Sequence, residues 1–355
     1  MDEKEIFDLI SEIGEEIIDE DTLRSIVISK EGVIAYDGFE PSGRIHIAQG
    51  VMRTINTNKI TKAGGRFKFW IADWFAMLNR KYDGDLVRIR NAGKLMIETF
   101  KACGMDTEKV EFLWSSEEIN KDPNRYWSLV MDISIKFNLN RILKCTQIMG
   151  RKESDDLNAS QIFYPVMQCA DIFCLGVNVG SLGLDQRKVN MLAREYCDKV
   201  NQANKKSKNK RLLKPVILSH HMLLGLKGEN KMSKSDPESA IYMDDQEMDV
   251  NRKIKRSFCP IEGLHNNPVL QYVKYIILEI FKVVSIVRKE ENGGDKDYDN
   301  YEELEKDFLS GSLHPGDLKK AVSKYINKIL GPVREYFKTN PAAQKLRNLV
   351  KGYSK

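Results

Sequence analysis

Short strand-like runs alternate with longer helical patterns over the first two-thirds of the chain, and this alternation constrains the fold more than any other feature. The strand-like runs are rich in β-branched and aromatic residues and lie at 32–39, 66–73, 110–114 and 215–219. Strands separated by helices are typical of a parallel sheet with helical crossovers. We therefore predict an α/β fold with a parallel sheet.

A helix is predicted between the second and third of these strands. Asp85 suits its N-cap and Gly104 suits its C-terminal end. The apolar residues between them recur at helical spacing. They are Leu86, Ile89, Leu95, Met96 and Phe100.

Strand patterns are absent after about residue 245. The remainder is predicted to be helical, with helices over 271–287 and 317–330 and a charged, glycine-containing connector at 288–303. We therefore predict two domains, an α/β domain over residues 1–245 and an all-α domain over residues 246–355.

Composition excludes several classes of protein. The 355 residues are 42% hydrophobic and 30% charged, with no apolar run long enough to cross a membrane. The acidic N-terminus lacks the basic start of signal and transit peptides, so we expect a cytoplasmic protein. Six scattered cysteines without a CxxC pair, and five histidines, do not predict a structural metal. A net charge of +5 is compatible with a nucleic-acid partner and with many other functions.

The first predicted strand leads through a Pro-Ser-Gly turn at residues 41–43 into a helix that we expect to begin near His46. The N–H groups of such a helix start favour a bound anion, and His46 would donate a hydrogen bond beside it. Small residues at Gly38, Gly43, Ala48 and Gly50 would let a nucleotide approach the backbone. An ordinary strand–turn–helix connection explains this segment equally well.

A second candidate phosphate site lies at residues 228–236, where Lys231 and Lys234 are flanked by serines in a loop rich in glycine, asparagine and serine. Two ammonium groups on such a loop would stabilise charge that develops on a polyphosphate. By itself, a short Lys/Ser stretch is more often a solvated loop.

Together, the two segments resemble the HIGH and KMSKS signatures of class I aminoacyl-tRNA synthetases. Residues 231–235 match the second signature at every letter, whereas Ala48 and Gln49 replace the last two letters of the first. Gln49 can donate to a phosphate but cannot carry an imidazolium charge. The resemblance implies a Rossmann-like catalytic domain followed by an anticodon-binding domain. It also implies catalytic or ATP-binding roles for the residues of both signatures, which are His46, Gln49, Lys231, Met232, Ser233, Lys234 and Ser235.

Residues 161–175 form a mostly apolar segment with a polar stripe. Tyr164, Gln168 and Asp171 are spaced by four and three, so they share one face of a helix in which Pro165 would occupy the first turn. Buried polar groups need internal partners or a ligand. The stripe therefore predicts either a ligand site or a polar network that joins two core elements.

This segment, with residues 183–188, resembles the tyrosine site of tyrosyl-tRNA synthetases of the archaeal and eukaryotic cytosolic type. The likeness covers nearly the whole chain and is strongest at residues 32–50, 160–196 and 231–245. It implies that Tyr36 and Asp171 bind the phenolic hydroxyl of tyrosine, and that Tyr164, Gln168 and Gln186 bind the region of its α-amino group. It further implies an ATP site that includes Gly38, Gly43, Gly183, Asp185, Met222 and Leu223.

The resemblance implies a tyrosine–tRNA ligase, which activates L-tyrosine with Mg²⁺-bound ATP and transfers it to tRNA(Tyr). A tyrosine hydroxyl and a carboxylate suit a phenol, because phenylalanine would leave both groups unpaired at a cost of about 1–3 kcal/mol for each neutral group. A tryptophan enzyme is the nearest rival, but an indole needs only one acceptor. An RNA-binding paralogue without catalysis, or a signalling protein that reuses the fold, remains possible.

RNA contacts and assembly also follow from the resemblance. It implies contacts of Arg187 and Lys188 with the acceptor stem, and of His314 and Asp317 with the anticodon. The basic tract at 204–211 is either an RNA contact or a surface loop. Asn292 stands where relatives carry an aromatic residue, so either another ring such as Tyr298 stacks on the anticodon or this contact is weaker. The relatives are homodimers, and we expect a homodimer here.

Overall fold

The computed structural model describes residues 1–355 except 151–155, 208–210, 229–231, 233–235, 262–265 and 355. The chain divides into two compact units. Unit 1 comprises residues 1–42, 57–94 and 106–221, and unit 2 comprises residues 43–56, 95–105 and 222–355. Unit 1 contains a six-stranded sheet, and unit 2 is mainly helical.

Several helices begin at a proline or directly after an Asp or Asn N-cap. The α-helices are α1 (Glu3–Ser11), α2 (Glu20–Val27), α3 (Arg53–Lys62), α4 (Asp73–Leu78), α5 (Leu86–Ala102), α6 (Ser115–Lys121), α7 (Pro123–Lys136), α8 (Leu139–Leu143), α9 (Ala159–Cys174), α10 (Arg187–Ser207), α11 (Glu247–Arg256), α12 (Pro268–Tyr272), α13 (Leu278–Phe281), α14 (Tyr301–Leu309), α15 (Pro315–Thr339) and α16 (Pro341–Lys351).

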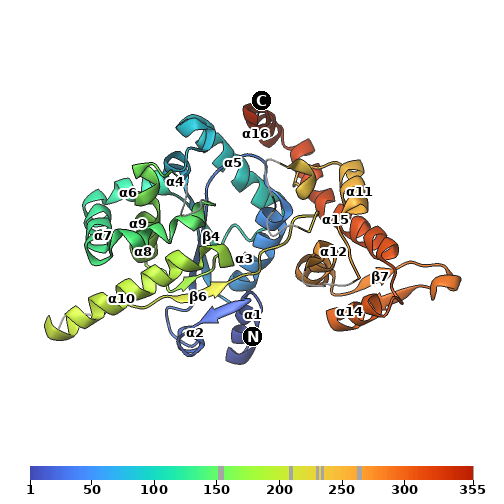
Figure 1. Cartoon of the computed structure of the whole chain (residues 1–355), viewed down its shortest axis with the longest axis horizontal. Coiled ribbons are helices and arrows are strands. Elements are labelled where there is room, and N and C mark those ends of the chain that lie inside the picture. Colours follow the sequence, from blue (N-terminus) through green and yellow to red (C-terminus); the bar gives the residue numbers. More distant parts are fainter. Residues whose placement is uncertain (151–155, 208–210, 229–231, 233–235, 262–265, 355) are drawn as a thin grey trace. The chain divides into compact units, whose positions relative to one another are not determined.

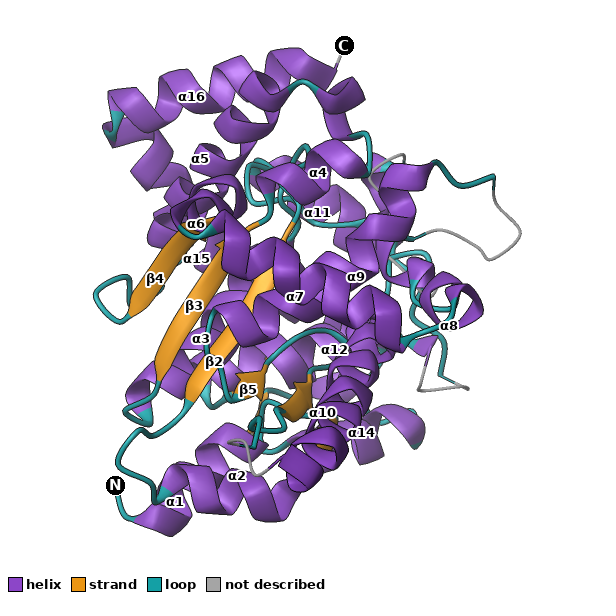
Figure 2. Ribbon diagram, turned by 90° about the vertical axis from the view of Figure 1, so that its left-hand side faces the viewer, coloured by secondary structure: helices purple, strands orange, loops and turns teal. Residues whose placement is uncertain are grey.

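The sheet of unit 1 has the order β1-β6-β5-β2-β3-β4, and every neighbouring pair is parallel except β1 with β6. Figure 2 shows β2, β3 and β4 side by side. This order confirms the predicted α/β fold. The strands are β1 (Glu16–Ile18), β2 (Ile34–Phe39), β3 (Arg66–Ile71), β4 (Val110–Trp114), β5 (Val179–Gly180) and β6 (Val216–Ser219).

All four predicted strands are present, but the sheet is not wholly parallel. The antiparallel edge strand β1 lies in the acidic N-terminal segment, where no strand is predicted. Three residues are too short for a strand pattern, and it is pairing with β6 that makes them extended. Strand β3, the second of the predicted strands, ends at Ile71 instead of residue 73, because Asp73 begins α4.

The predicted helix between β3 and β4 is α5. The Asp85 carboxylate accepts from the N–H groups of Val87 at 2.9 Å and Arg88 at 3.1 Å, which confirms the N-cap. Gly104 follows the helix with a φ of +78°, a left-handed conformation that glycine adopts without strain.

Helices α7, α9 and α10 pack against one another in unit 1 (Figure 1). Their inner faces share one buried cluster with residues of the sheet, including Tyr36 of β2 and Trp70 of β3. The polar stripe of α9 therefore lies within the core of unit 1, not on its surface.

Unit 2 corrects the prediction that no strands follow residue 245. The helical segment predicted over 271–287 ends at Phe281, where Lys282 adopts a φ of +63°. The β-branched run beyond it forms β7 (Val284–Ile286), which pairs antiparallel with β8 (Lys296–Tyr298) inside the predicted connector. The sequence pattern of the helix runs directly into that of the strand. Lys282, with its left-handed backbone conformation, ends the helix between them.

Helix α15 is longer than the predicted 317–330, because it continues through Pro332. Proline lacks the N–H that would bond to the carbonyl of Lys328. Leu330, Val333 and Phe337 remain buried along the same face. Burial of these apolar side chains outweighs the missing hydrogen bond.

Candidate active site

Helix α9 positions the polar stripe. Its start is set by a capping box, in which the Gln161 side chain accepts from the N–H of Asn158 at 3.1 Å. Pro165 is therefore inside the helix and not in its first turn, which corrects the sequence prediction. Since Pro165 has no N–H to offer the Gln161 carbonyl, the early cap and the buried face of α9 must hold the helix together.

The Asp171 carboxylate is completely buried and only half satisfied. Its Oδ1 accepts from the Tyr126 hydroxyl of α7 at 2.8 Å, while Oδ2 has no partner within the described residues. Burial raises the pKa of Asp171 well above its usual value, and the Tyr126 hydroxyl and the Trp70 indole oppose part of this rise. A buried carboxylate oxygen without a donor needs an explanation.

Tyr36 supplies a second unsatisfied atom to the same buried cluster. The side chain is 1% exposed, and its hydroxyl has no hydrogen-bond partner among the residues that are described. Burial, followed by the nearby Asp171 carboxylate, raises the pKa of this hydroxyl, so it stays protonated and able to donate. A ligand hydroxyl could accept from Tyr36 and donate to Asp171, which would satisfy both groups.

The other two stripe residues are held by hydrogen bonds. Gln168 Nε2 donates to Gln186 Oε1 at 3.0 Å, and Gln186 Nε2 donates to the carbonyl of Ile148 at 3.2 Å. The two glutamines are thus brought together from α9 and from the turn before α10, as predicted. Their remaining lone pairs and N–H groups are available to a polar ligand.

Contacts with Glu40 and Phe75 hold the Tyr164 side chain in place. Its pKa is raised by burial and then by the Glu40 carboxylate, to which its hydroxyl donates. Asn79 Nδ2 donates to Glu40 at 2.8 Å, and Lys81 lies 3.3 Å from the same carboxylate. The ring of Tyr164 meets that of Phe75 edge to face at 4.9 Å.

Sequence reasoning missed Tyr126, Trp70 and Glu40. Tyr126 shares the helical spacing of Val130 and Ile133, a pattern that indicates core packing and gives no sign of a site. The link between Tyr126 and Asp171 does join two core elements, as the alternative interpretation expected. However, it leaves one oxygen of Asp171 and the hydroxyl of Tyr36 unsatisfied.

In unit 2, the expected phosphate-binding turn has the predicted form. Gly43 has a φ of +66°, and His46 pairs with Tyr242 in an isolated antiparallel bridge. The helix begins just after His46, as a π-helical turn over Ala48–Met52 that continues into α3. Gly50 packs closely against Met243, because a Cβ there would lie 2.6 Å from its Sδ.

The remaining predicted residues are placed as follows. Leu223 and Met232 are buried, Met222 is half-buried and Asp185 is exposed, while Gly183 pairs with His220. Arg187 forms an ion pair with Glu16 at 2.8 Å, and Lys188 donates to Gln147. Lys231, Ser233, Lys234 and Ser235 lie outside the described residues.

In the second predicted domain, His314 is the N-cap of α15, and Asp317 lies in the first turn of that helix. Tyr298 does not offer a stacking surface. It is fully buried, and its hydroxyl donates to Asp307 at 2.8 Å.

No helix in the described part of the chain is long and apolar enough to cross a membrane. No group of three or more His, Cys, Asp or Glu residues there is arranged to hold a metal ion.

Comparison with known proteins identifies the class of protein. The family model described as "tRNA synthetases class I (W and Y)" matches residues 29–331. The chain belongs to this family.

The relatives narrow this class to one amino acid. Tyrosine–tRNA ligase 1, cytoplasmic, of Arabidopsis thaliana is 56% identical over 348 residues, which are 98% of this chain and 88% of that protein. The tyrosine–tRNA ligase of Thermococcus kodakarensis is 38% identical, with 95% of each chain covered. Within the family, the chain belongs with the tyrosine–tRNA ligases.

A solved structure agrees with this assignment. Leishmania major tyrosyl-tRNA synthetase in complex with tyrosinol is 45% identical, with a TM-score of 0.91 over all of this chain. The match covers 53% of that chain, so this chain spans about half of the Leishmania protein's length.

Proposed function

We propose that this protein activates L-tyrosine with ATP and transfers it to tRNA(Tyr). One observation carries the proposal. Among the described residues, neither the Tyr36 hydroxyl nor Oδ2 of Asp171 has a hydrogen-bond partner, and the two buried side chains are close enough to interact electrostatically, as a site for a phenol requires. The Arabidopsis relatives are named cytoplasmic, and we propose the same location for this chain.

Tyrosine would bind with its phenol between Tyr36 and Asp171. Tyr164, Gln168 and Gln186 would hold the α-amino end, since these side chains are already oriented by Glu40 and by the Ile148 carbonyl. A preoriented pocket loses little freedom on binding, which favours both affinity and alignment of the carboxylate for attack.

ATP would be bound by backbone and side-chain groups of three parts of the sequence. We propose Gly38, Gly43, His46 and Gln49 from the first signature and the strand before it, and Gly183 and Asp185 from the segment after α9. The rest of the proposed set is Met222, Leu223, Met232 and the loop residues Lys231, Ser233, Lys234 and Ser235. Mg²⁺ would enter as part of the ATP substrate.

The reaction would need no covalent bond to the protein. The tyrosine carboxylate attacks the α-phosphorus, pyrophosphate leaves, and a terminal ribose hydroxyl of the tRNA then attacks the adenylate carbonyl. The protein's share is orientation and fixed positive charge, which together lower the barrier without a nucleophilic side chain. Gln49 would donate a hydrogen bond and would not transfer a proton.

Arg187 and Lys188 would contact the acceptor stem, and His314 and Asp317 would contact the anticodon. We further propose that residues 1–245 form the catalytic domain and residues 246–355 the anticodon-binding domain. Relatives carry an aromatic residue at the position of Asn292. Because Tyr298 is buried, it does not take over the stacking role of that residue. We therefore expect weaker stacking on the first anticodon base than in relatives that carry the ring.

The proposed homodimer has a candidate surface on α7. Trp127, Met131 and Ile135 recur at intervals of four and are 37%, 57% and 83% exposed. A row of large exposed apolar side chains on one helix face is typical of a protein interface. We propose that a second copy of the chain covers this row in a two-fold symmetric contact.

Met131→Asp and Ile135→Asp are each expected to shift the protein from dimer to monomer by at least about tenfold in dissociation constant, because each buries a carboxylate at the contact. Sedimentation velocity over a concentration series measures the shift. Val87→Asp, which changes an exposed apolar residue of α5 that is not part of the row, is the matched control. A dimer of unchanged strength in both apolar-to-Asp variants would refute this surface.

The proposed activity is tested by ATP–pyrophosphate exchange without tRNA, comparing tyrosine, tryptophan and phenylalanine. We expect exchange with tyrosine alone. Exchange with tryptophan would overturn the roles of Tyr36 and Asp171. Folded protein without exchange for any of the three would favour an RNA-binding paralogue or a signalling role.

A further inference from the structure

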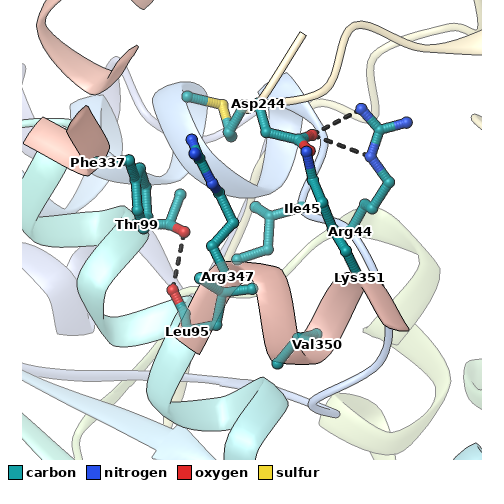
Figure 3. Close-up of a pocket in the computed structure, with 10 residues that line it drawn as sticks. Arg44, Ile45, Leu95, Thr99, Asp244, Phe337, Arg347, Val350 and Lys351 are labelled. Atoms are coloured by element: carbon teal, nitrogen blue, oxygen red, sulfur yellow. Dashed lines mark hydrogen bonds and ion pairs between the residues drawn. The ribbon is translucent and has the colours of Figure 1, made fainter. Parts of the chain in front are cut away.

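The loop that leads to His46 is held in unit 2 by two successive carboxylates. Arg44 donates from Nε and Nη2 to Oδ1 of Asp244 at 2.9 and 2.6 Å, and from Nη2 to Oδ1 of Asp245 at 2.8 Å. Figure 3 shows the Arg44 and Asp244 side chains facing each other. The guanidinium carbon also lies 4.2 Å from the centroid of the Tyr242 ring. A guanidinium with these three contacts has little freedom to rotate.

The backbone on either side of His46 is held by the same segment. The Met243 N–H donates to the Ile45 carbonyl at 2.9 Å, and the Ile47 N–H donates to the Ile241 carbonyl at 2.8 Å. His46 lies between these two bonds, opposite Tyr242. The Arg44 side chain therefore adds a third attachment between the same two segments, two residues before the imidazole.

The two carboxylates are themselves fixed by other elements of unit 2. Oδ2 of Asp245 accepts from the Tyr242 N–H at 3.0 Å and from Nζ of buried Lys253 in α11 at 2.6 Å. Its carbonyl accepts from Nε of Arg334 in α15 at 2.9 Å. The attachment point of Arg44 is therefore rigid, which a positioning contact requires.

Asp244 is tied to the C-terminal helix. Nζ of Lys351 in α16 lies 2.7 Å from Oδ2 of Asp244, whereas both Arg44 hydrogen bonds to this carboxylate go to Oδ1. Burial by itself would raise the pKa of Asp244, but Arg44 and Lys351 outweigh it and lower the pKa. The carboxylate is therefore charged at neutral pH and keeps its attraction for Arg44.

We propose that Arg44 is a positioning residue for tyrosine activation, which holds the His46 imidazole in place through its ion pairs with Asp244 and Asp245. This inference rests on the proposed function, since it assigns His46 to the phosphates of ATP. Arg44 does not have to touch the nucleotide itself. A displacement of about 1 Å in a group that stabilises the transition state can cost about 100-fold in rate.

A double-mutant cycle between Arg44→Met and His46→Ala tests the proposal. Each kcat for tyrosine-dependent exchange is divided by the number of active sites, which the burst of adenylate formation counts. Arg44→Met alone should lower kcat by at least about 10-fold and change the KM for tyrosine by less than about 2-fold. With His46→Ala already present, the same change should cost less than about 3-fold, because Arg44 acts through His46. Arg44→Lys should restore part of kcat, since a lysine keeps the charge without the forked contact.

Two further variants separate positioning from general stability. Asp244→Asn weakens the same contact from the other side, and it replaces Arg44→Met in the cycle if that variant does not fold. Lys296→Met removes an ion pair with Asp307 elsewhere in unit 2, which makes no contact with Arg44, Asp244 or Asp245, so it should lower the melting temperature and leave kcat within about 2-fold. Equal losses for Arg44→Met in both backgrounds, or an unchanged kcat, would overturn the proposal. Wild-type protein without exchange would instead refute the proposed function.

Discussion

Replacing Asp171 with asparagine is expected to lower kcat/KM for tyrosine in pyrophosphate exchange by about 10- to 100-fold. Tyr126 holds Oδ1 of the side chain, so in the variant the phenol would meet the Nδ2 amide group, a donor, where it needs an acceptor, and a buried polar group left unpaired costs about 1–3 kcal/mol. The Tyr126 hydroxyl can still donate to the asparagine Oδ1, so the pocket keeps its shape. The preference for tyrosine over phenylalanine should narrow, since phenylalanine never used the carboxylate.

The same substitution is expected to leave stability unchanged or to increase it. Burial raises the pKa of Asp171 above its ordinary value of 3.8, so the folded protein holds a proton that the unfolded chain has lost. The contribution of this group to stability is therefore complete below pH 3.8 and is lost as pH rises towards the folded-state pKa. Asparagine does not titrate, so over this pH range the free energy of unfolding of the variant should rise relative to that of the wild type. Denaturant unfolding as a function of pH measures the difference.

Asp198→Asn is the matched control, because Asp198 pairs with Lys214 on the surface of α10. It should leave exchange within about 2-fold. If Asp171→Asn leaves kcat/KM for tyrosine intact, the carboxylate does not receive the phenol. If the variant instead loses activity and stability together, Asp171 has a structural role.

Lys231→Ala and Lys234→Ala are each expected to lower kcat for tyrosine activation by about 100- to 1000-fold, while tyrosine affinity changes little. Negative charge develops on the departing pyrophosphate in the transition state, and a fixed positive group aimed at it typically contributes this much. Met232, which lies between the two lysines in the sequence, is buried, with 7% of its surface exposed. Exchange kinetics give kcat, and equilibrium titration gives the dissociation constant of tyrosine.

Lys227→Ala provides the control in the same segment. The Lys227 ammonium is paired with the Asp236 carboxylate at 2.5 Å, so its charge is already neutralised, and its loss should change kcat by less than about 2-fold. Unchanged adenylate formation in both loop variants would remove the lysines from the mechanism. An equal fall in tyrosine affinity would move them to the amino-acid pocket.

Local patterns were enough to predict much of the fold. The four strands between residues 32 and 219 and the helix that Asp85 caps depend on β-branched runs, 3.6-residue spacing and caps, all of which involve neighbours in sequence. The stripe of Tyr164, Gln168 and Asp171 was predicted for the same reason. Where two patterns meet, as at Lys282, or where a strand has only three residues, as in β1, local signals failed.

The sequence by itself determined the class of fold, the helix face that carries the polar stripe and, by resemblance, the family. The tertiary structure decided which of those polar groups are satisfied. Tyr126 takes one oxygen of Asp171 and leaves the other open, although the two residues are 45 positions apart. The tertiary structure also pairs the Arg44 guanidinium with the carboxylate of Asp244, which is 200 residues further along the sequence. Hydrogen bonds of this kind depend on where the packing of the core brings distant segments together, and neither composition nor periodicity records that.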